Sequence, residues 1–161
     1  MNMNTLPSQS QETHSVGARA SRGYLLACGS FLLVTGIVGF MLDTSFPTRP
    51  AEVSASHGHI FGVLETNGWH NLAAVGIGLP SLAVALRAAR LAAPFAFTAG
   101  ALNLGVFILF ALFGPEAFLF ASNSGDQVLH AVLAVGGLGF GAWGLSGRTT
   151  QSIDAPGIAP R

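Results

Sequence analysis

Long apolar runs alternate with short polar segments along this chain, and four such runs can be distinguished. The clearest is Tyr24–Leu42, which carries no charged residue. Each run is close to the about 20 residues that a helix needs to cross about 30 Å of hydrocarbon. Helices also satisfy their own backbone hydrogen bonds inside a bilayer. We therefore predict membrane-spanning helices over about residues 23–42, 66–89, 93–113 and 126–146.

The polar segments between these runs predict how the helices are connected. Short connections after the second and third helices force neighbours to run antiparallel. The predicted fold is an all-α integral membrane bundle, an antiparallel four-helix bundle of two helical hairpins, over residues 22–147. The longer connection 43–66 is expected to pack over the bundle mouth, with a short helix around His57–Leu64. Residues 1–21 and 148–161 are predicted to be disordered cytoplasmic tails.

Composition separates this chain from soluble proteins. Half of its 161 residues are hydrophobic and 9% are charged, whereas a soluble domain carries about 25% charged residues. Seven basic residues balance seven acidic ones, so no basic field indicates a nucleic-acid partner. The single cysteine, Cys28, excludes an intrachain disulfide.

The arginines predict the orientation of the helices. Arg19 and Arg22 precede the first helix, Arg87 and Arg90 lie between the second and third, and Arg148 follows the fourth. All five fall on one side of the membrane if both termini are cytoplasmic. Arginine is enriched in cytoplasmic loops. We therefore expect an N-in/C-in protein of a bacterial cytoplasmic (inner) membrane.

Polar residues open the second and fourth helices in a similar way. The stretches Trp69–Gly76 and Leu129–Gly136 share His, Ala, Val and Gly at equivalent positions. This similarity suggests two hairpins in the same orientation, related by an axis along the membrane normal. It also places His70 and His130 at one depth, about one turn inside the outer ends of their helices.

These two histidines belong to a larger group of polar residues expected at the outer side of the bundle. The predicted cluster, also a candidate ligand-binding site, consists of Asn67, His70, Asn71, Asp126, His130 and Asn103. Asn67 and Asp126 are suitable helix N-caps. Asn103 lies in mid-helix and needs an interhelical partner.

Small residues predict where the helices approach closely. Below His130, steps of four and three residues reach Ala134, Gly137, Gly141 and Gly144. The spacing of Gly137 and Gly141 is typical of helices whose backbones come close together. In the second helix, Pro80 removes a hydrogen bond to the carbonyl of Gly76, and Ser81 or a neighbouring helix could satisfy that carbonyl.

Several functions fit this pattern. The first is a non-enzymatic scaffold or partner subunit that assembles with itself as a homo-oligomer or with another membrane protein. In this hypothesis the polar cluster ties helices together. The second is a redox subunit that binds haem b or a metal through His70 and His130. A weaker alternative is a small transporter or proton relay that works as an oligomer.

The chain offers weak candidates for a separate metal site and none for catalysis. His57, His59 and Glu65 in the outer loop, with Glu52 nearby, could hold a transition metal, but no complete ligand set is visible. No phosphate-binding loop, nucleophile elbow or zinc-protease motif is present. We therefore expect no cofactor and no enzymatic activity.

The segments FGVLETNGWHNLAAVGIG and GDQVLHAVLAVGGLGFGAWG resemble a bacterial family, domain of unknown function 4383. The resemblance covers about residues 22–146 and rests on Asn67, His70 and Asn71, then on Asp126 and His130. It implies a small four-helix inner-membrane protein and implies no activity. Many members look to have a second histidine four residues after the first, where this chain has Ala74.

Overall fold

Four long helices form the body of the protein in this computed structural model, which describes residues 9–53 and 58–153, with side chains from residue 16 to residue 146. The long helices are α1 (Gln9–Leu42), α3 (Gly68–Arg87), α4 (Ala92–Phe113) and α5 (Ser124–Ile153). Four helices in the described part of the chain are long and apolar enough to cross a membrane. The predicted all-α four-helix bundle is therefore confirmed.

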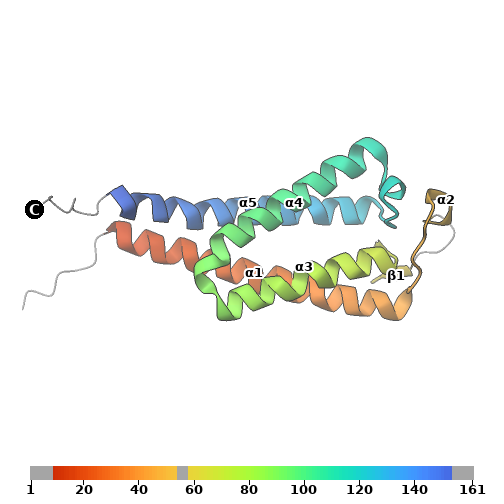
Figure 1. Cartoon of the computed structure of the whole chain (residues 1–161), viewed down its shortest axis with the longest axis horizontal. Coiled ribbons are helices and arrows are strands. Elements are labelled where there is room, and N and C mark those ends of the chain that lie inside the picture. Colours follow the sequence, from red (N-terminus) through yellow and green to blue (C-terminus); the bar gives the residue numbers. More distant parts are fainter. Residues whose placement is uncertain (1–8, 54–57, 154–161) are drawn as a thin grey trace, which may run out of the picture.

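The helices pair as the two predicted hairpins. α1 packs along α3, α4 packs along α5, and α1 also packs against α5 (Figure 1). A Cβ added at Gly78 of α3 would lie 2.7 Å from the backbone nitrogen of Leu33, so these helices touch backbone to backbone. On α5, a Cβ at Gly137 would lie 2.6 Å from the Cα of Gly100, and one at Gly141 would lie 2.5 Å from the nitrogen of Phe97. The predicted small face of α5 is thus its contact surface with α4.

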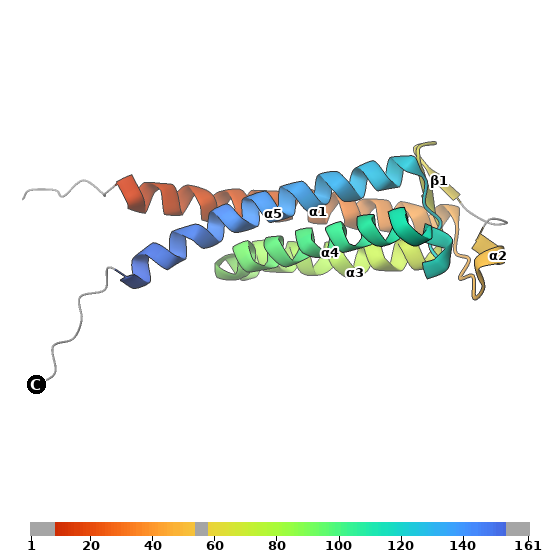
Figure 2. The ribbon, with the colours of Figure 1, turned by 90° about the horizontal axis from the view of Figure 1, so that it is seen from above.

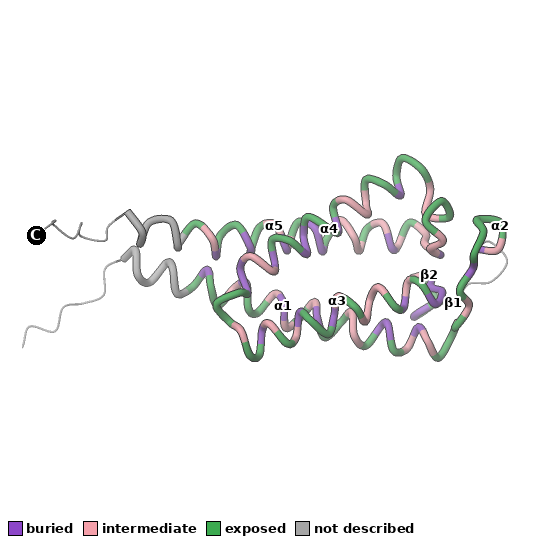
Figure 3. Tube along the Cα trace, in the orientation of Figure 1, coloured by how far each residue is buried: buried purple, intermediate pink, exposed green. Residues whose placement is uncertain are grey.

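The bundle buries small residues and turns large apolar ones outward. Ala85, Ala92 and Ala96 are fully buried, whereas Met41 is 81% exposed and Val135 is 75% exposed. Figure 3 shows the buried positions following the lines along which helices face one another. An apolar exterior of this extent would be a liability in water and is suited to lipid.

The α1–α3 hairpin and the α4–α5 hairpin splay apart toward one end of the bundle, and the separation includes α3 and α4 (Figure 1). A short 3-10 helix, η1 (Ala89–Leu91), joins them at the termini end of the bundle, the end that holds the start of α1 and the end of α5. From there the two helices separate toward the opposite end, which we call the loop end (Figure 1), and they overlap when seen from above (Figure 2). Few residues of α3 and α4 touch, whereas α1 and α5 remain in contact.

The predicted disordered tails need correction where the structure describes them. α1 is already helical at Gln9 and α5 continues to Ile153, beyond the predicted bounds. The extension of α1 packs against α5, which explains why it is helical. The Ser21 hydroxyl donates to the carbonyls of Gly17 (3.0 Å) and Phe140 (2.7 Å). Residues 1–8 and 154–161 lie outside the described residues.

The connection after α1 also differs from its prediction. It contains a single turn, α2 (Pro50–Val53), and an antiparallel hairpin of β1 (Gly58–Ile60) and β2 (Leu64–Thr66). The expected helix around residues 57–64 is wrong, because Phe61 and Gly62 both have positive φ, 54° and 71°, in the turn between the strands. Two successive residues with positive φ reverse the chain in a hairpin and cannot continue a right-handed helix. A second 3-10 turn, η2 (Pro115–Phe118), precedes α5.

The hydrogen bond of Ser81 near Pro80 in α3 differs from the one expected. The Ser81 hydroxyl donates to the carbonyl of Ile77 at 2.7 Å, and not to the carbonyl of Gly76. α3 nevertheless runs unbroken through Pro80 to Arg87. Its C-terminal half packs against α1 through Gly78 and Ser81, both of which are close to Gly29.

Candidate functional site

Three buried polar side chains join the loops to the helices at the loop end. They are Asn67, Asn71 and Asp126, each at most 1% exposed, and we call them the clasp. Asn67 is the N-cap of α3, as predicted, because its Oδ1 accepts from the backbone N–H of His70 at 3.0 Å. Its Nδ2 donates to the carbonyl of Leu119 at 2.9 Å. One amide therefore begins α3 and holds the loop between α4 and α5.

Asn71 holds the other loop. Its Nδ2 donates to the carbonyl of Asp43 at 2.9 Å, directly after the end of α1, and its Oδ1 accepts from the Thr66 hydroxyl. The polar cluster was predicted to tie helices together, and its partners were left open in the sequence. Asn71 ties α3 to the end of α1 and to β2. This pairing follows from the position of Asn71 on the α1-facing side of α3, where a Cβ at Gly36 would lie 3.0 Å from its carbonyl.

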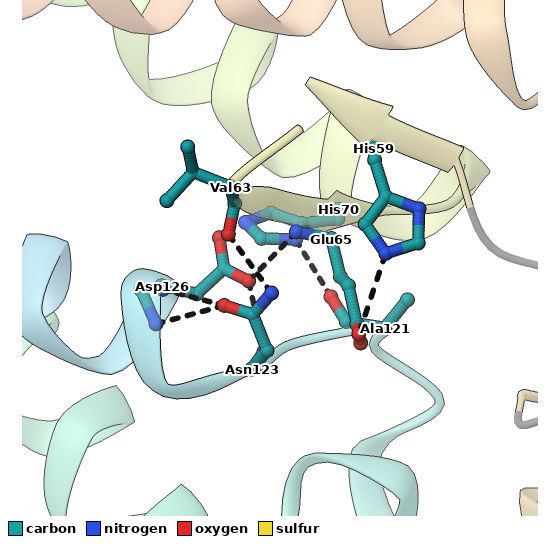
Figure 4. A network of polar contacts seen from close by, with 8 residues as sticks. His59, Val63, Glu65, His70, Ala121, Asn123 and Asp126 are labelled. Carbon is teal, nitrogen blue, oxygen red and sulfur yellow. Dashed lines mark hydrogen bonds and ion pairs between the residues drawn. The ribbon is translucent and has the colours of Figure 1, made fainter. Parts of the chain in front are cut away.

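Asp126 joins the hairpin to α5. One carboxylate oxygen, Oδ2, accepts from the backbone N–H of Glu65 at 3.0 Å and of Asn123 at 2.9 Å (Figure 4). Asp126 is not the N-cap of α5, contrary to expectation. Asn123 has that place, since α5 begins at Ser124 and the Asn123 Oδ1 accepts from the N–H groups of Gly125 (2.8 Å) and Asp126 (3.2 Å).

His70 and His130 lie together beneath the clasp, at one level, as their equivalent positions predicted. Their ring centroids are 6.2 Å apart and the rings are nearly parallel, at 15°. The Nδ1 of His70 is 2.9 Å from the carbonyl oxygen of Ala121, and the Nδ1 of His130 is 3.0 Å from the Oδ1 of Asn103. Asn103 is buried in mid-helix, and His130 of the neighbouring helix is the interhelical partner that was predicted for it.

The surroundings of the histidine pair do not fit a haem. Phe110 lies edge-on to His130 with centroids 5.8 Å apart, and Phe120 lies 5.9 Å from His70. The cavity that both histidines line is about 190 Å³. A cavity of about 150 Å³ accommodates one benzene ring, so this space is far too small for a porphyrin. We derive no redox function through haem.

The weak metal candidates do not converge in the described part of the chain. His59 and Glu65 face each other across the hairpin, with Nε2 and Oε1 3.7 Å apart (Figure 4). His57 lies outside the described residues. No group of three or more His, Cys, Asp or Glu side chains that could hold a metal occurs among the described residues.

Glu52 forms hydrogen bonds within its own turn and is not part of the His59–Glu65 pair. Its Oε2 accepts from the Thr48 N–H at 2.8 Å, and its Oε1 accepts from the Arg49 guanidinium at 2.7 and 2.9 Å. These contacts, that of the Thr48 N–H first, lower the pKa of Glu52 to about 2. The carboxylate therefore stabilises the start of α2 and stays ionised at neutral pH.

Sequence reasoning missed several members of this site. Thr66 is 1% exposed and donates to Asn71, and Asn123 caps α5. The pattern Asn-x-x-Asp before the fourth apolar run is a capping signal that could have identified Asn123. The acceptors on Asp43 and Leu119 are backbone carbonyls, and no side-chain pattern could have revealed them.

A comparison of the sequence with known protein families finds a match. The sequence model of the family described as Domain of unknown function (DUF4383) matches residues 22–143. The chain belongs to this family. The matched range includes the histidine pair, all three clasp residues, α3 and α4 in full and most of the spanning parts of α1 and α5. With four helices able to cross a membrane, this DUF4383 member is a small multi-pass membrane protein.

No curated protein and no solved structure matches the chain. Any function for this DUF4383 member therefore has to be argued from its own residues.

Proposed function

We propose that this protein is a non-enzymatic membrane subunit that serves as a scaffold or partner for other membrane proteins. The supporting observation is the use of the clasp, because each of Asn67, Asn71 and Asp126 is committed to backbone groups or a buried hydroxyl of the loops. Hydrogen-bonded in this way, the side chains hold the loop end in one shape. A loop end held in a fixed shape above a lipid-embedded bundle suits recognition by a partner better than it suits catalysis.

The orientation in this proposal is N-in/C-in, with the loop end outside a bacterial inner membrane. In support, the start of α1 and the end of α5 lie on the same side of the bundle as the α3–α4 connection and project beyond it (Figure 1). These elements carry five of the arginines, which favour the cytoplasmic side.

A groove between α4 and α5 is the best candidate for the partner's position. It has a volume of about 560 Å³ and its lining includes Phe107, Gln127, Val132 and Gly136. Among the described residues the buried Oε1 of Gln127 has no hydrogen-bond partner. Lipid tails offer no donor. A rotation of the Gln127 side chain would bring this acceptor into the groove, where a transmembrane helix of a partner protein could supply the donor.

Site-specific crosslinking tests the partner role. A photoreactive residue at Val132, in the groove, is compared in intact membranes with one at Met41, which is 81% exposed on α1. We expect a discrete protein adduct at Val132 and none at Met41. An adduct with a second copy would identify a homo-oligomeric scaffold. Lipid adducts alone at both positions would refute the proposal.

A second comparison tests the clasp. Asn71→Ala leaves the Asp43 carbonyl and the Thr66 hydroxyl without their partner, at a cost of about 1–3 kcal/mol in the free energy of unfolding. Leu72→Ala, one residue along and 49% exposed, is the matched control and should cost less. Thermal unfolding in detergent and the yield of the Val132 adduct are measured together. If Asn71→Ala changes neither, the clasp does not hold the loop end in shape.

A further inference from the structure

A cavity opens where α3 and α4 diverge, and neither the clasp nor the groove accounts for it. Its volume is about 190 Å³. Its apolar lining includes Leu32, Ala73, Ile77, Val106 and Phe118. The position between two spanning helices makes it accessible to molecules dissolved in the membrane, and less so to charged molecules in water.

Three polar side chains interrupt this apolar lining, and they are His70, His130 and Asn103. The Ala121 carbonyl can only accept a hydrogen bond, so the contact at 2.9 Å requires the proton of neutral His70 to be on Nδ1. The Nδ2 of Asn103 donates to the Ala99 carbonyl, which leaves its Oδ1 to accept from the Nδ1 of His130. In its neutral form each imidazole therefore has an unprotonated Nε2, which is a hydrogen-bond acceptor.

The dimensions and the aromatic lining favour a flat ring as the occupant. About 150 Å³ is sufficient for benzene in an apolar cavity, so 190 Å³ accommodates a small substituted ring. Phe110 and Phe120 present their rings beside the histidine pair. Aromatic side chains favour offset or edge-on contact with another ring.

We propose that this cavity binds the ring of a quinol dissolved in the membrane, with His70 and His130 as acceptors for its two hydroxyl groups. A quinol combines the three properties that the cavity selects, which are a flat apolar ring, hydroxyl donors and solubility in lipid. A hydrocarbon chain on the ring can remain in the bilayer beyond the diverging helices. This binding is independent of the scaffold or partner role and stands or fails separately from it.

The test compares a probe that can donate hydrogen bonds with probes that cannot. Trimethylhydroquinone carries two hydroxyls. Its dimethyl ether has no donor but is larger by two methyl groups, so pentamethylbenzene, in which one methyl replaces each hydroxyl, is the size-matched control and should bind as weakly as the ether. Binding to the full-length protein in nanodiscs is measured by calorimetry under anaerobic conditions. We expect the hydroquinone to bind at least about tenfold more tightly than the ether, which corresponds to about 1.4 kcal/mol. Equal binding of the hydroquinone and either control, or no binding of the hydroquinone, overturns the proposal.

Nitrogen NMR of histidine-labelled protein gives a second readout that needs no variant of the cavity. The Nε2 resonances of His70 and His130 should shift on addition of the hydroquinone and stay in place on addition of the ether. Resonances that are unchanged by the hydroquinone would contradict the assignment of these histidines as acceptors.

Two substitutions with matched controls locate the binding. His130→Phe removes one acceptor and should weaken hydroquinone binding about tenfold, while His59→Phe in the hairpin should leave it unchanged. Ala73→Phe fills the cavity and should abolish binding, while Ala111→Phe on the exposed face of α4 should not. Retention of full affinity in both His130→Phe and Ala73→Phe would show that the hydroquinone binds elsewhere.

Discussion

The contact between α4 and α5 gives the sharpest prediction about stability. Gly137→Ala adds one methyl group where its Cβ would lie 2.6 Å from the Cα of Gly100 and 2.8 Å from the carbonyl oxygen of Ala96. Both neighbours are backbone atoms, so neither can turn away. Gly139→Ala, two residues along the same helix, meets nothing within 4 Å. The two variants therefore differ in packing and share the same chemical change.

Two opposing contributions to the free energy of unfolding can be separated by comparing these variants. Replacing glycine by alanine inside a helix stabilises it by about 0.5–1 kcal/mol, and this gain applies to both variants. Overpacking a tight contact costs about 1–3 kcal/mol, and this cost applies only at Gly137. We expect Gly139→Ala to be neutral or slightly stabilising. The free energy of unfolding should be lower for Gly137→Ala than for Gly139→Ala by about 1–3 kcal/mol.

Unfolding by sodium dodecyl sulfate in mixed micelles measures this difference. Tryptophan fluorescence is a suitable signal, because Trp143 of α5 packs against Gly17 of α1 and loses that contact when the helices separate. Equal stability of the two variants would refute the close backbone contact between α4 and α5. A larger loss in Gly139→Ala would reverse the assignment of the packed and lipid-facing sides of α5.

Two further predictions concern single hydrogen-bonding groups. Tyr24→Phe removes the hydroxyl that donates to the Leu133 carbonyl at 2.6 Å. It should lower the free energy of unfolding in sodium dodecyl sulfate by about 1 kcal/mol. An unchanged value would mean that lipid or water replaces this bond at no cost. For Glu52, carbon NMR should give a titration midpoint near pH 2 in the folded protein, below the about 4.3 of an unperturbed glutamate. Because the folded pKa is lowered, the carboxylate stabilises the α2 turn above about pH 4.3 and loses this effect as the pH falls to 2. Arg49→Ala should raise the midpoint, and an unchanged midpoint would exclude the Arg49 contact as a cause.

The sequence was sufficient for the features that depend on composition and period. Runs of apolar residues located the four helices, and the spacing of Gly137 and Gly141 located the contact face of α5. The equivalent positions of His70 and His130 were enough to place them at one level. These signals are local, or repeat along one helix, so each can be seen in a single stretch of sequence.

The features that were missed depend on the fold as a whole. The hairpin between α2 and α3 has strands of three residues each, too short for an alternating pattern to be distinguished from a helical one. The acceptors of Asn67 and Asn71 are backbone carbonyls, which every residue has. The cavity lies where α3 and α4 diverge, and the divergence of two helices depends on how the hairpins pack, which neither helix shows in its own sequence.

The length of α1 has a mechanical consequence. Its 34 residues rise about 51 Å at 1.5 Å each, well beyond the about 30 Å of a bilayer core. It is one continuous helix from Gln9 to Leu42, and the next carbonyl, that of Asp43, is held by Asn71. Because α1 is continuous and is packed against α3 and α5, it cannot turn alone. A displacement at its start is therefore transmitted along the whole bundle to the loop end.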